Sequence, residues 1–267
     1  MRSLRYGQLG VRVYSSYADV GAAAAGDFAD AVRDQLLLQD VIAVILSTGN
    51  SQLSFFQALL GRHDIDWGRL IVLQADEYVG LAPSNPVSLQ STMQQAFVRH
   101  AGVKAFVGFE GDRVPVEDEV KRYAAIVGQL SPVLCVIGIG ENGHIGFNDP
   151  PADFVTENLV RVVTLDARCR AQQVGEGHFA SVEQVPPQGL TLTVHALLQP
   201  PIVMVVTPER RKAEAVWRTL EGPVSPDCPA SILRRKAGAR LYLDEDSAAL
   251  LNRGESVARG EGSADAL

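Results

Sequence analysis

The chain has 267 residues, of which 46% are hydrophobic and 21% charged, and its formal net charge is -7 at pH 7. This composition suits a soluble globular protein with a sizeable core. The acidic balance argues against nucleic acid as a partner, because surfaces that bind nucleic acid are basic. No apolar run reaches the roughly 18 residues that a membrane span needs, so we expect no membrane partner.

The cysteines give no sign of a metal site or of a reactive thiol. There are three, Cys135, Cys169 and Cys228, and their spacing is not that of metal ligands. We expect none of them to be catalytic, because no neighbouring group would generate a thiolate. The first ten residues are mixed and polar, unlike a signal peptide. A reducing, cytoplasmic location is therefore expected.

Short β-branched runs alternate with helical patterns along the chain. Residues 19–38 are rich in alanine, with apolar residues at helical spacing, and predict a covering helix. Runs that are apolar on both faces predict buried strands at 41–46, 70–75, 133–139 and 201–207. Helical patterns follow at 52–60 and 209–220, and further strand candidates lie at 161–165, 189–194 and 240–244.

This alternation predicts an α/β fold. We expect a single Rossmann-like domain over residues 1–253, with a largely parallel sheet covered by helices on both faces. The remaining residues, 254–267, are small and polar, and predict a disordered tail. No internal repeat and no long linker interrupts the chain.

Four unusual polar segments directly follow predicted strands. They are residues 47–52, 76–80, 138–149 and 207–212. Because ligands of open parallel sheets bind outside the carboxyl ends of the strands, we expect these segments to meet around one site.

The first and last of these segments have features of a phosphate site. The sequence STGNSQ at 47–52 opens a helix, where free N–H groups can receive a phosphate, although such turns are also common connectors. Lys212 lies about one turn into a helix and either adds positive charge to the site or is simply solvated.

The two middle segments contain the acid–base candidates. Asp76 and Glu77 follow a buried strand, and because side chains alternate, at most one of them faces the crevice. Asp76 either caps a turn or carries a proton in catalysis. His144, between glycines, is suited to acid–base work, and Asp149 can orient its ring if the loop folds back.

The remaining histidines are not expected in the site. His63 and His100 fall at polar helix or loop ends, and His178 and His195 have no local partner. All four are expected at the surface or in structural roles. We expect no metal at His144, because no second His or Cys stands at ligand spacing.

In this order the segments resemble the glucosamine-6-phosphate deaminase/6-phosphogluconolactonase family over about residues 40–245. The most specific pieces are ADEYVGL at 75–81, GIGENGHIGFNDP at 138–150, KAEAV at 212–216, LEG at 220–222 and PAS at 229–231. The runs DEYVG and GHIGFN favour the deaminase branch, since the lactonase branch usually has a basic residue after the acidic pair.

The resemblance implies a role for each matching position. Asp76 corresponds to the base that moves a proton between C2 and C1 of an opened amino sugar, and His144 to the ring-opening group. Asn142 and Asp149 correspond to their supporting residues. The phosphate-binding positions correspond to Thr48, Gly49, Asn50 and Lys212. The implied reaction turns glucosamine 6-phosphate into fructose 6-phosphate and ammonia, without metal or organic cofactor. The implied partner is a small sugar phosphate, and the implied protein is a monomer or a homo-oligomer.

The chain also departs from the family pattern. Asp149 replaces a Glu, which predicts a carboxylate on the order of 1.5 Å short of His144 unless the loop compensates. Gln173 stands at the position of a phosphate-binding Arg, with Arg168 and Arg170 as candidate substitutes. These departures keep two alternatives open, a lactone hydrolase with His144 as base and a sugar-phosphate-binding homologue with another substrate.

Overall fold

The computed structural model describes residues 1–251, and the predicted tail at 254–267 lies outside them. An eight-stranded sheet has the order β1-β2-β11-β10-β7-β3-β4-β6. Its strands are β1 (Arg2–Tyr6), β2 (Leu9–Tyr14), β3 (Ile42–Leu46), β4 (Leu70–Gln74), β6 (Ala105–Val107), β7 (Leu134–Ile137), β10 (Ile202–Val206) and β11 (Ala239–Asp244). All neighbouring pairs are parallel except β1 and β2. The predicted α/β class with a largely parallel sheet is confirmed.

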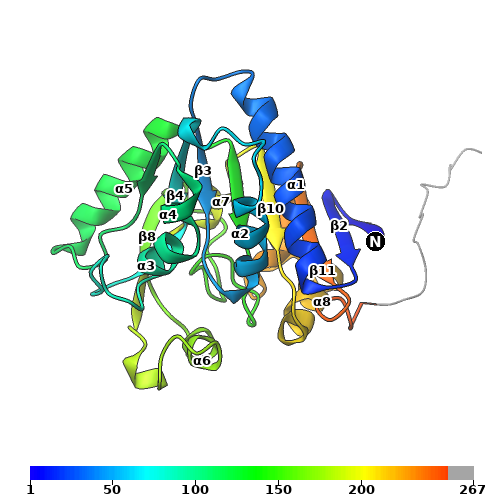
Figure 1. The fold of residues 1–267 in the computed structure, drawn as a ribbon. Coiled ribbons are helices and arrows are strands. Elements are labelled where there is room, and N and C mark those ends of the chain that lie inside the picture. The colour runs from blue at the N-terminus through cyan, green and yellow to red at the C-terminus, as the bar shows by residue number, and fades with distance from the viewer. Residues whose placement is uncertain (252–267) are drawn as a thin grey trace, which may run out of the picture.

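Helices cover both faces of this sheet (Figure 1). They are α1 (Tyr17–Leu36), α2 (Leu53–Leu60), α3 (Leu89–Met93), α4 (Arg99–Ala101), α5 (Val116–Leu130), α6 (Ala167–Gly175), α7 (Val194–Leu198) and α8 (Ala213–Glu221). Alternate residues of β3 belong to different cores: Val44 packs with α1, α2 and α4, and Ile45 packs with α5, α7 and α8. The continuous apolar run of this strand follows from burial on both faces.

A second, small sheet adjoins the first. It has the order β5-β9-β8, with β5 (Asp76–Tyr78), β9 (Gln188–Leu192) and β8 (Val160–Thr164) paired antiparallel. The strand candidates at 161–165 and 189–194 therefore exist, but they lie outside the parallel sheet. The sequence pattern did not predict the strands β1, β2, β5 and β6 or the helices α3, α4, α5, α6 and α7.

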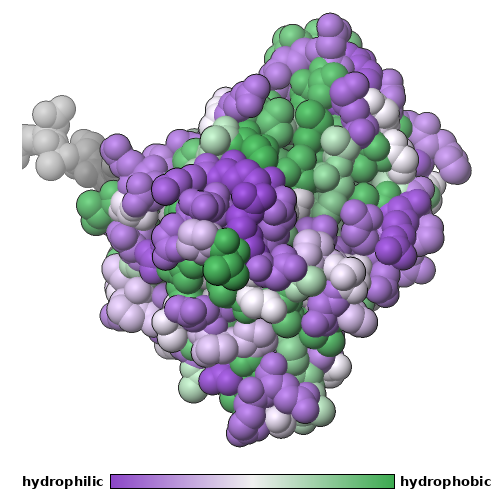
Figure 2. All heavy atoms as spheres, turned by 90° about the vertical axis from the view of Figure 1, so that its left-hand side faces the viewer, coloured by the Kyte–Doolittle hydropathy of each residue, from purple (hydrophilic) through white to green (hydrophobic). Residues whose placement is uncertain are grey.

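The open edge of the large sheet is formed by β6, whose three residues are half-buried. Seen from that side, apolar residues form a patch that polar side chains surround (Figure 2). Among residues 1–251, no helix combines the length and the apolarity required to cross a bilayer.

The crossing of α1 and α2 positions the turn at 47–52. A Cβ atom on Gly21 of α1 would lie 2.4 Å from the carbonyl carbon of Ser54, so only glycine allows this approach. The hydroxyl of Tyr17 donates to the carbonyl oxygen of Asn50 at 2.5 Å. Close packing of the two helices thus fixes the turn that precedes α2.

We predict that Gly21→Ala destabilises the protein by about 1–3 kcal/mol, because the added methyl group overpacks the contact between the helices. The matched control is Gly26→Ala in the same helix, where a Cβ atom would meet nothing closer than 3.9 Å. That substitution should stabilise by about 0.5–1 kcal/mol through helix propensity. Urea unfolding measures both, and equal stabilities of the two variants would contradict the packing argument.

Candidate active site

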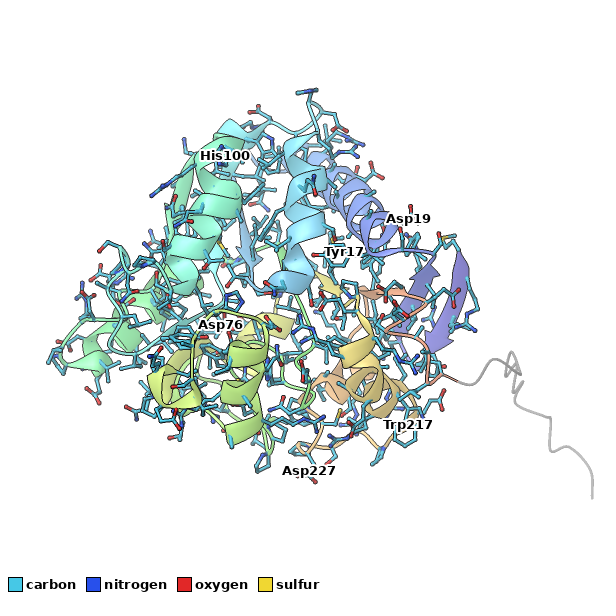
Figure 3. The ribbon with its side chains drawn as sticks, turned by 60° about the horizontal axis from the view of Figure 1, so that its bottom comes forward. Tyr17, Asp19, Asp76, His100, Trp217 and Asp227 are labelled. Carbon is cyan, nitrogen blue, oxygen red and sulfur yellow. The ribbon has the colours of Figure 1, made fainter. Side chains whose placement is uncertain are left out.

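The four predicted polar segments contribute to one pocket at the carboxyl ends of the central strands. The pocket has a volume of about 640 Å³, including its open mouth, and part of its lining comes from α6 and the turn after it, residues 167–178, here called the α6 segment. Figure 3 looks onto this edge and shows Asp76 near its middle. The lining residues include Thr48, Gly49, Asn50, Asp76, His144, Gln172, Gln173, Glu176, His178 and Lys212.

The two adjacent acids point to different places. Asp76 lines the pocket but is only 6% exposed, and burial followed by the charge of Glu77 raises the pKa of Asp76 to about 7. Glu77 does not line the pocket. Its carboxylate accepts hydrogen bonds from the backbone N–H groups of Tyr78, Leu89 and Gln90. Thus one acid of the pair faces the pocket, as alternation along the strand requires.

His144 is held by a tightly folded loop. Gly140 donates its N–H to the carbonyl of His144 at 2.9 Å, and a Cβ atom on Gly140 would lie 2.2 Å from the imidazole. Nδ1 of His144 lies 3.1 Å from Oδ1 of Asp149. The loop therefore folds back far enough to compensate for the shorter side chain, which was the condition attached to the expected shortfall. The contact has ion-pair distance but is not aligned as a hydrogen bond.

A polar network lies behind His144, away from the pocket. Asn142 accepts from the N–H of His144 at 3.0 Å and donates to Asp149 at 2.9 Å and to Asp166 at 3.0 Å. Burial alone would raise the pKa of Asp149, but contacts with His144, Asp166 and Asn142 lower it below its usual range. Asp166 was missed in the sequence, although it precedes α6 as its N-cap, a position that favours Asp.

The cradle at 48–50 offers polar groups to the pocket. Gly49 has φ +130 and precedes the 3-10 helix η1 (Asn50–Gln52), which leads into α2. The start of a helix leaves backbone N–H groups without helical partners. The hydroxyl of Thr48 is buried and has no hydrogen-bond partner among the described residues. These donors fit an anion.

Lys212 is the basic residue that lines the pocket, and it is 2% exposed. Burial lowers the pKa of Lys212, while Glu176, 3.7 Å from its ammonium group, opposes that shift. Gln173, which the resemblance placed at the position of a phosphate-binding Arg, lines the pocket. Neither suggested substitute replaces that Arg, because Arg168 pairs with Glu214 and Arg170 donates to the carbonyl groups of Val182 and Val185.

The α6 segment adds residues that sequence analysis did not assign to the site. His178, expected at the surface or in a structural role, lines the pocket, and its Nε2 lies 3.4 Å from Glu176. Gln172 and Glu176 also line it. Glycines at 175 and 177 flank Glu176 and interrupt the helical pattern, so the sequence did not show which residues here would face the pocket.

Two potential metal ligands lie beside His144, a proximity that the spacing in the sequence did not predict. Ligand atoms of His144, Asp149 and Cys169 lie within 4.8 Å of one another. Burial raises the pKa of Cys169 well above its usual value, so the thiol stays protonated next to Asp149. We therefore read this group as part of the support of His144.

Comparison with known proteins shows the family to which the chain is related. A family model described as glucosamine-6-phosphate isomerases/6-phosphogluconolactonase matches residues 15–242. A glucosamine-6-phosphate deaminase of Exiguobacterium sibiricum is 33% identical over 228 residues, which are 83% of this chain and 88% of that protein. Glucosamine-6-phosphate deaminase 1 of Bacillus subtilis is 30% identical over 241 residues, 88% of this chain and 96% of that protein.

Solved structures extend the comparison. A monomeric glucosamine-6-phosphate deaminase has a TM-score of 0.83 at 28% identity, over 90% of this chain and 99% of that one. A 6-phosphogluconolactonase of Thermotoga maritima has a TM-score of 0.71 at 16% identity, over 88% of this chain and 99% of that one. The second likeness is one of fold alone.

We predict that Asp76→Asn stabilises the protein at high pH. Between pH 4 and 7 the unfolded chain has lost the Asp76 proton that the native state keeps, so this group's contribution to stability falls as pH rises. The raised pKa corresponds to a cost of about 4 kcal/mol above pH 7, which the amide avoids.

Urea unfolding near pH 4 and near pH 8 tests this expectation. The stability gain of Asp76→Asn should grow from near zero to several kcal/mol between these values. Asp34→Asn, an exposed acid on α1, is the control and should show no such growth. A gain that is the same at both pH values would mean that Asp76 is ionised at little cost.

Proposed function

The chain belongs to the glucosamine-6-phosphate isomerase/6-phosphogluconolactonase family, and from this premise we propose that it is an enzyme that converts glucosamine 6-phosphate and water into fructose 6-phosphate and ammonia. One observation carries the proposal. A buried carboxylate, Asp76, and a carboxylate-paired imidazole, His144, line the same pocket as an anion cradle and Lys212.

His144 opens the sugar ring in the first step. Its imidazole takes the proton of the anomeric hydroxyl and returns a proton to the ring oxygen as the C1–O bond breaks. The charge of Asp149, 3.1 Å away, stabilises the imidazolium that forms. Asn142 fixes the position of Asp149 relative to His144 by bonding to the carboxylate of the first and the backbone N–H of the second.

Asp76 then moves a proton within the open chain. Its carboxylate removes the proton from C2 while the aldehyde oxygen O1 gains the proton that the C2 ammonium group gives up, which leaves an enolamine. The acid then gives its proton to C1 as the nitrogen loses another proton to water. The resulting C2 imine takes up water and releases ammonia, so that the ketose phosphate remains. A pKa of about 7 suits this role, since one group must accept and donate a proton near neutral pH.

The phosphate end is served by Thr48, Gly49, Asn50 and Lys212. The cradle supplies a hydroxyl and backbone N–H groups, and Lys212 supplies charge. Gln173 can donate a hydrogen bond but brings no charge, which weakens phosphate binding relative to an Arg.

We further propose that residues 1–253 act as one cytoplasmic domain without nucleic-acid or membrane partners. Pocket residues come from segments spread between positions 47 and 212 of the same chain, so the site depends on the whole fold.

We predict ammonia release from glucosamine 6-phosphate, lowered at least about 10³-fold by Asp76→Asn, because the carbon proton transfer loses its base. His144→Gln should lower kcat by about 10²-fold, since opened sugar still forms slowly. An enzyme-coupled ammonia assay over a panel of amino-sugar phosphates measures this. Purified, folded protein that releases no ammonia from any of them would overturn the proposal. Hydrolysis of 6-phosphogluconolactone that survives Asp76→Asn would favour the lactonase alternative.

Asp149→Asn should lower kcat by about 10²-fold with a smaller change in KM, because Asp149 acts on His144 from behind the pocket. Asp153→Asn, an exposed acid four residues later, is the matched control and should keep full activity. Steady-state kinetics of both variants test the role, and wild-type kcat in Asp149→Asn would contradict it.

A further inference from the structure

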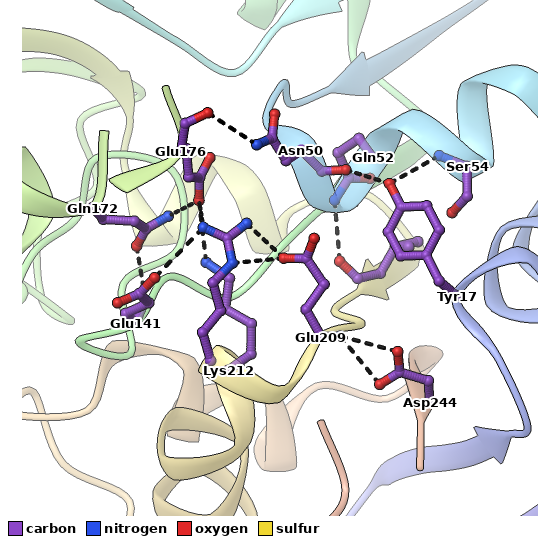
Figure 4. Close-up of polar contacts among 12 residues, drawn as sticks. Tyr17, Asn50, Gln52, Ser54, Glu141, Gln172, Glu176, Glu209, Lys212 and Asp244 are labelled. Atoms are coloured by element: carbon purple, nitrogen blue, oxygen red, sulfur yellow. Dashed lines mark hydrogen bonds and ion pairs between the residues drawn. The ribbon is translucent and has the colours of Figure 1, made fainter. Parts of the chain in front are cut away.

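The pocket contains a carboxylate that the proposed reaction does not use. Glu176 follows α6, and its side chain is 4% exposed (Figure 4). Its Oε1 accepts hydrogen bonds from Arg211 and from the side-chain amide of Gln172, both at 2.7 Å, and lies 3.7 Å from the ammonium group of Lys212. Its Oε2 lies 3.4 Å from Nε2 of His178.

These contacts are those of a bound anion. Two cations, an amide donor and an imidazole surround one carboxylate, and such charge-assisted contacts also hold phosphates in proteins. Burial alone would raise the pKa of Glu176, yet His178, Lys212 and Arg211 lower it to about 2. The carboxylate is therefore ionised at every pH at which the protein would work.

Glu176 lies beside the cradle. The side-chain amide of Asn50 donates to the carbonyl oxygen of Glu176 at 3.3 Å, and Asn50 and Glu176 line the same pocket as Lys212. An anion held by the cradle and by Lys212 would thus approach a fixed negative charge. In this structure Glu176 already pairs with Lys212 and balances its charge.

Arg211 does not depend on Glu176 alone. Its guanidinium also pairs with Glu209 at 2.5 Å and with Glu141 at 3.5 Å. Lys212 has weaker support, because its ion pair with Glu176 is long. Removing the charge of Glu176 would therefore mainly release Lys212.

We propose that Glu176 is a specificity-determining residue that competes with the phosphate of the substrate for Lys212. The inference rests on the proposed function in so far as that function places the phosphate at Lys212. If the Glu176 side chain stays, it repels the phosphate, and if it turns away, it loses its contacts with Arg211 and Gln172. Either event lowers the affinity for phosphate, so a ligand must add contacts from its sugar to bind well.

The test compares two isosteric variants. Glu176→Gln removes the charge inside the pocket, and Glu141→Gln removes a charge that also pairs with Arg211 but does not line the pocket. Titration with inorganic phosphate in a calorimeter gives Kd without any turnover. We expect Kd to fall about tenfold or more in Glu176→Gln and to change less than about threefold in Glu141→Gln. Unchanged or weaker binding in Glu176→Gln would overturn the proposal and make Glu176 a residue that positions its cationic neighbours.

A second set of variants keeps the test decisive if Glu176→Gln is unstable. Glu176→Ala removes the same charge and should raise the gain in Tm that phosphate produces, whereas an equal or smaller gain than in wild type counts against the proposal. The double variant Glu176→Gln, Lys212→Met should lose the added affinity, and its retention would show that Lys212 is not the contested group. Phosphate titration decides these outcomes even if no ammonia is formed from amino-sugar phosphates, so the two proposals fail separately.

Discussion

The pocket depends on one constraint: at residues 75–76 the chain passes from the large sheet into the small one. Ala75 donates its N–H to Leu46 in the parallel sheet, and its carbonyl accepts from Leu192 in the small sheet. The next residue, Asp76, then pairs with Thr191 on β9. The backbone of Asp76 is thus held where the two sheets meet, and its side chain is only 6% exposed. The same ladders that hold the fold together therefore keep this acid desolvated.

Two neighbouring acids show how local bonding decides what a buried carboxylate can do. Glu77 accepts three backbone N–H groups and the amide of Gln74, which offset part of the rise in pKa that burial causes. Among residues 1–251, no comparable set of donors reaches the carboxylate of Asp76, and the charge of Glu77 opposes its ionisation. Glu77 is thus a structural anchor for the start of α3, while Asp76 keeps a proton affinity that can be used. Identical chemistry one residue apart has different consequences because the strand turns the two side chains to opposite faces.

The parts of the molecule that rest on repeated patterns could be predicted from the sequence. Buried strands at 41–46 and 201–207, the covering helix at 19–38, and the meeting of four polar segments follow from apolar runs and from the rule on strand ends. The small sheet could not be predicted, because whether a strand such as 160–164 pairs parallel or antiparallel depends on partners distant in sequence. Glu176 and His178 were missed for a similar reason, since they lie in the turn after the short helix α6, and only folding shows that this turn faces the pocket.

The catalytic and anion-binding ends of the pocket tolerate change differently. In the proposed reaction, the steps at Asp76 and His144 depend on pKa and on distances held by backbone ladders and a closed loop, so a small shift in either would remove the reaction. At the other end a phosphate needs only positive charge and N–H donors, which several side chains can supply in several arrangements. A replacement such as Gln173 for an Arg, or a carboxylate such as Glu176, then changes affinity more than rate. The proposed function therefore places any difference in the preferred sugar phosphate at the anion end of the pocket, where Lys212, Gln173 and Glu176 lie.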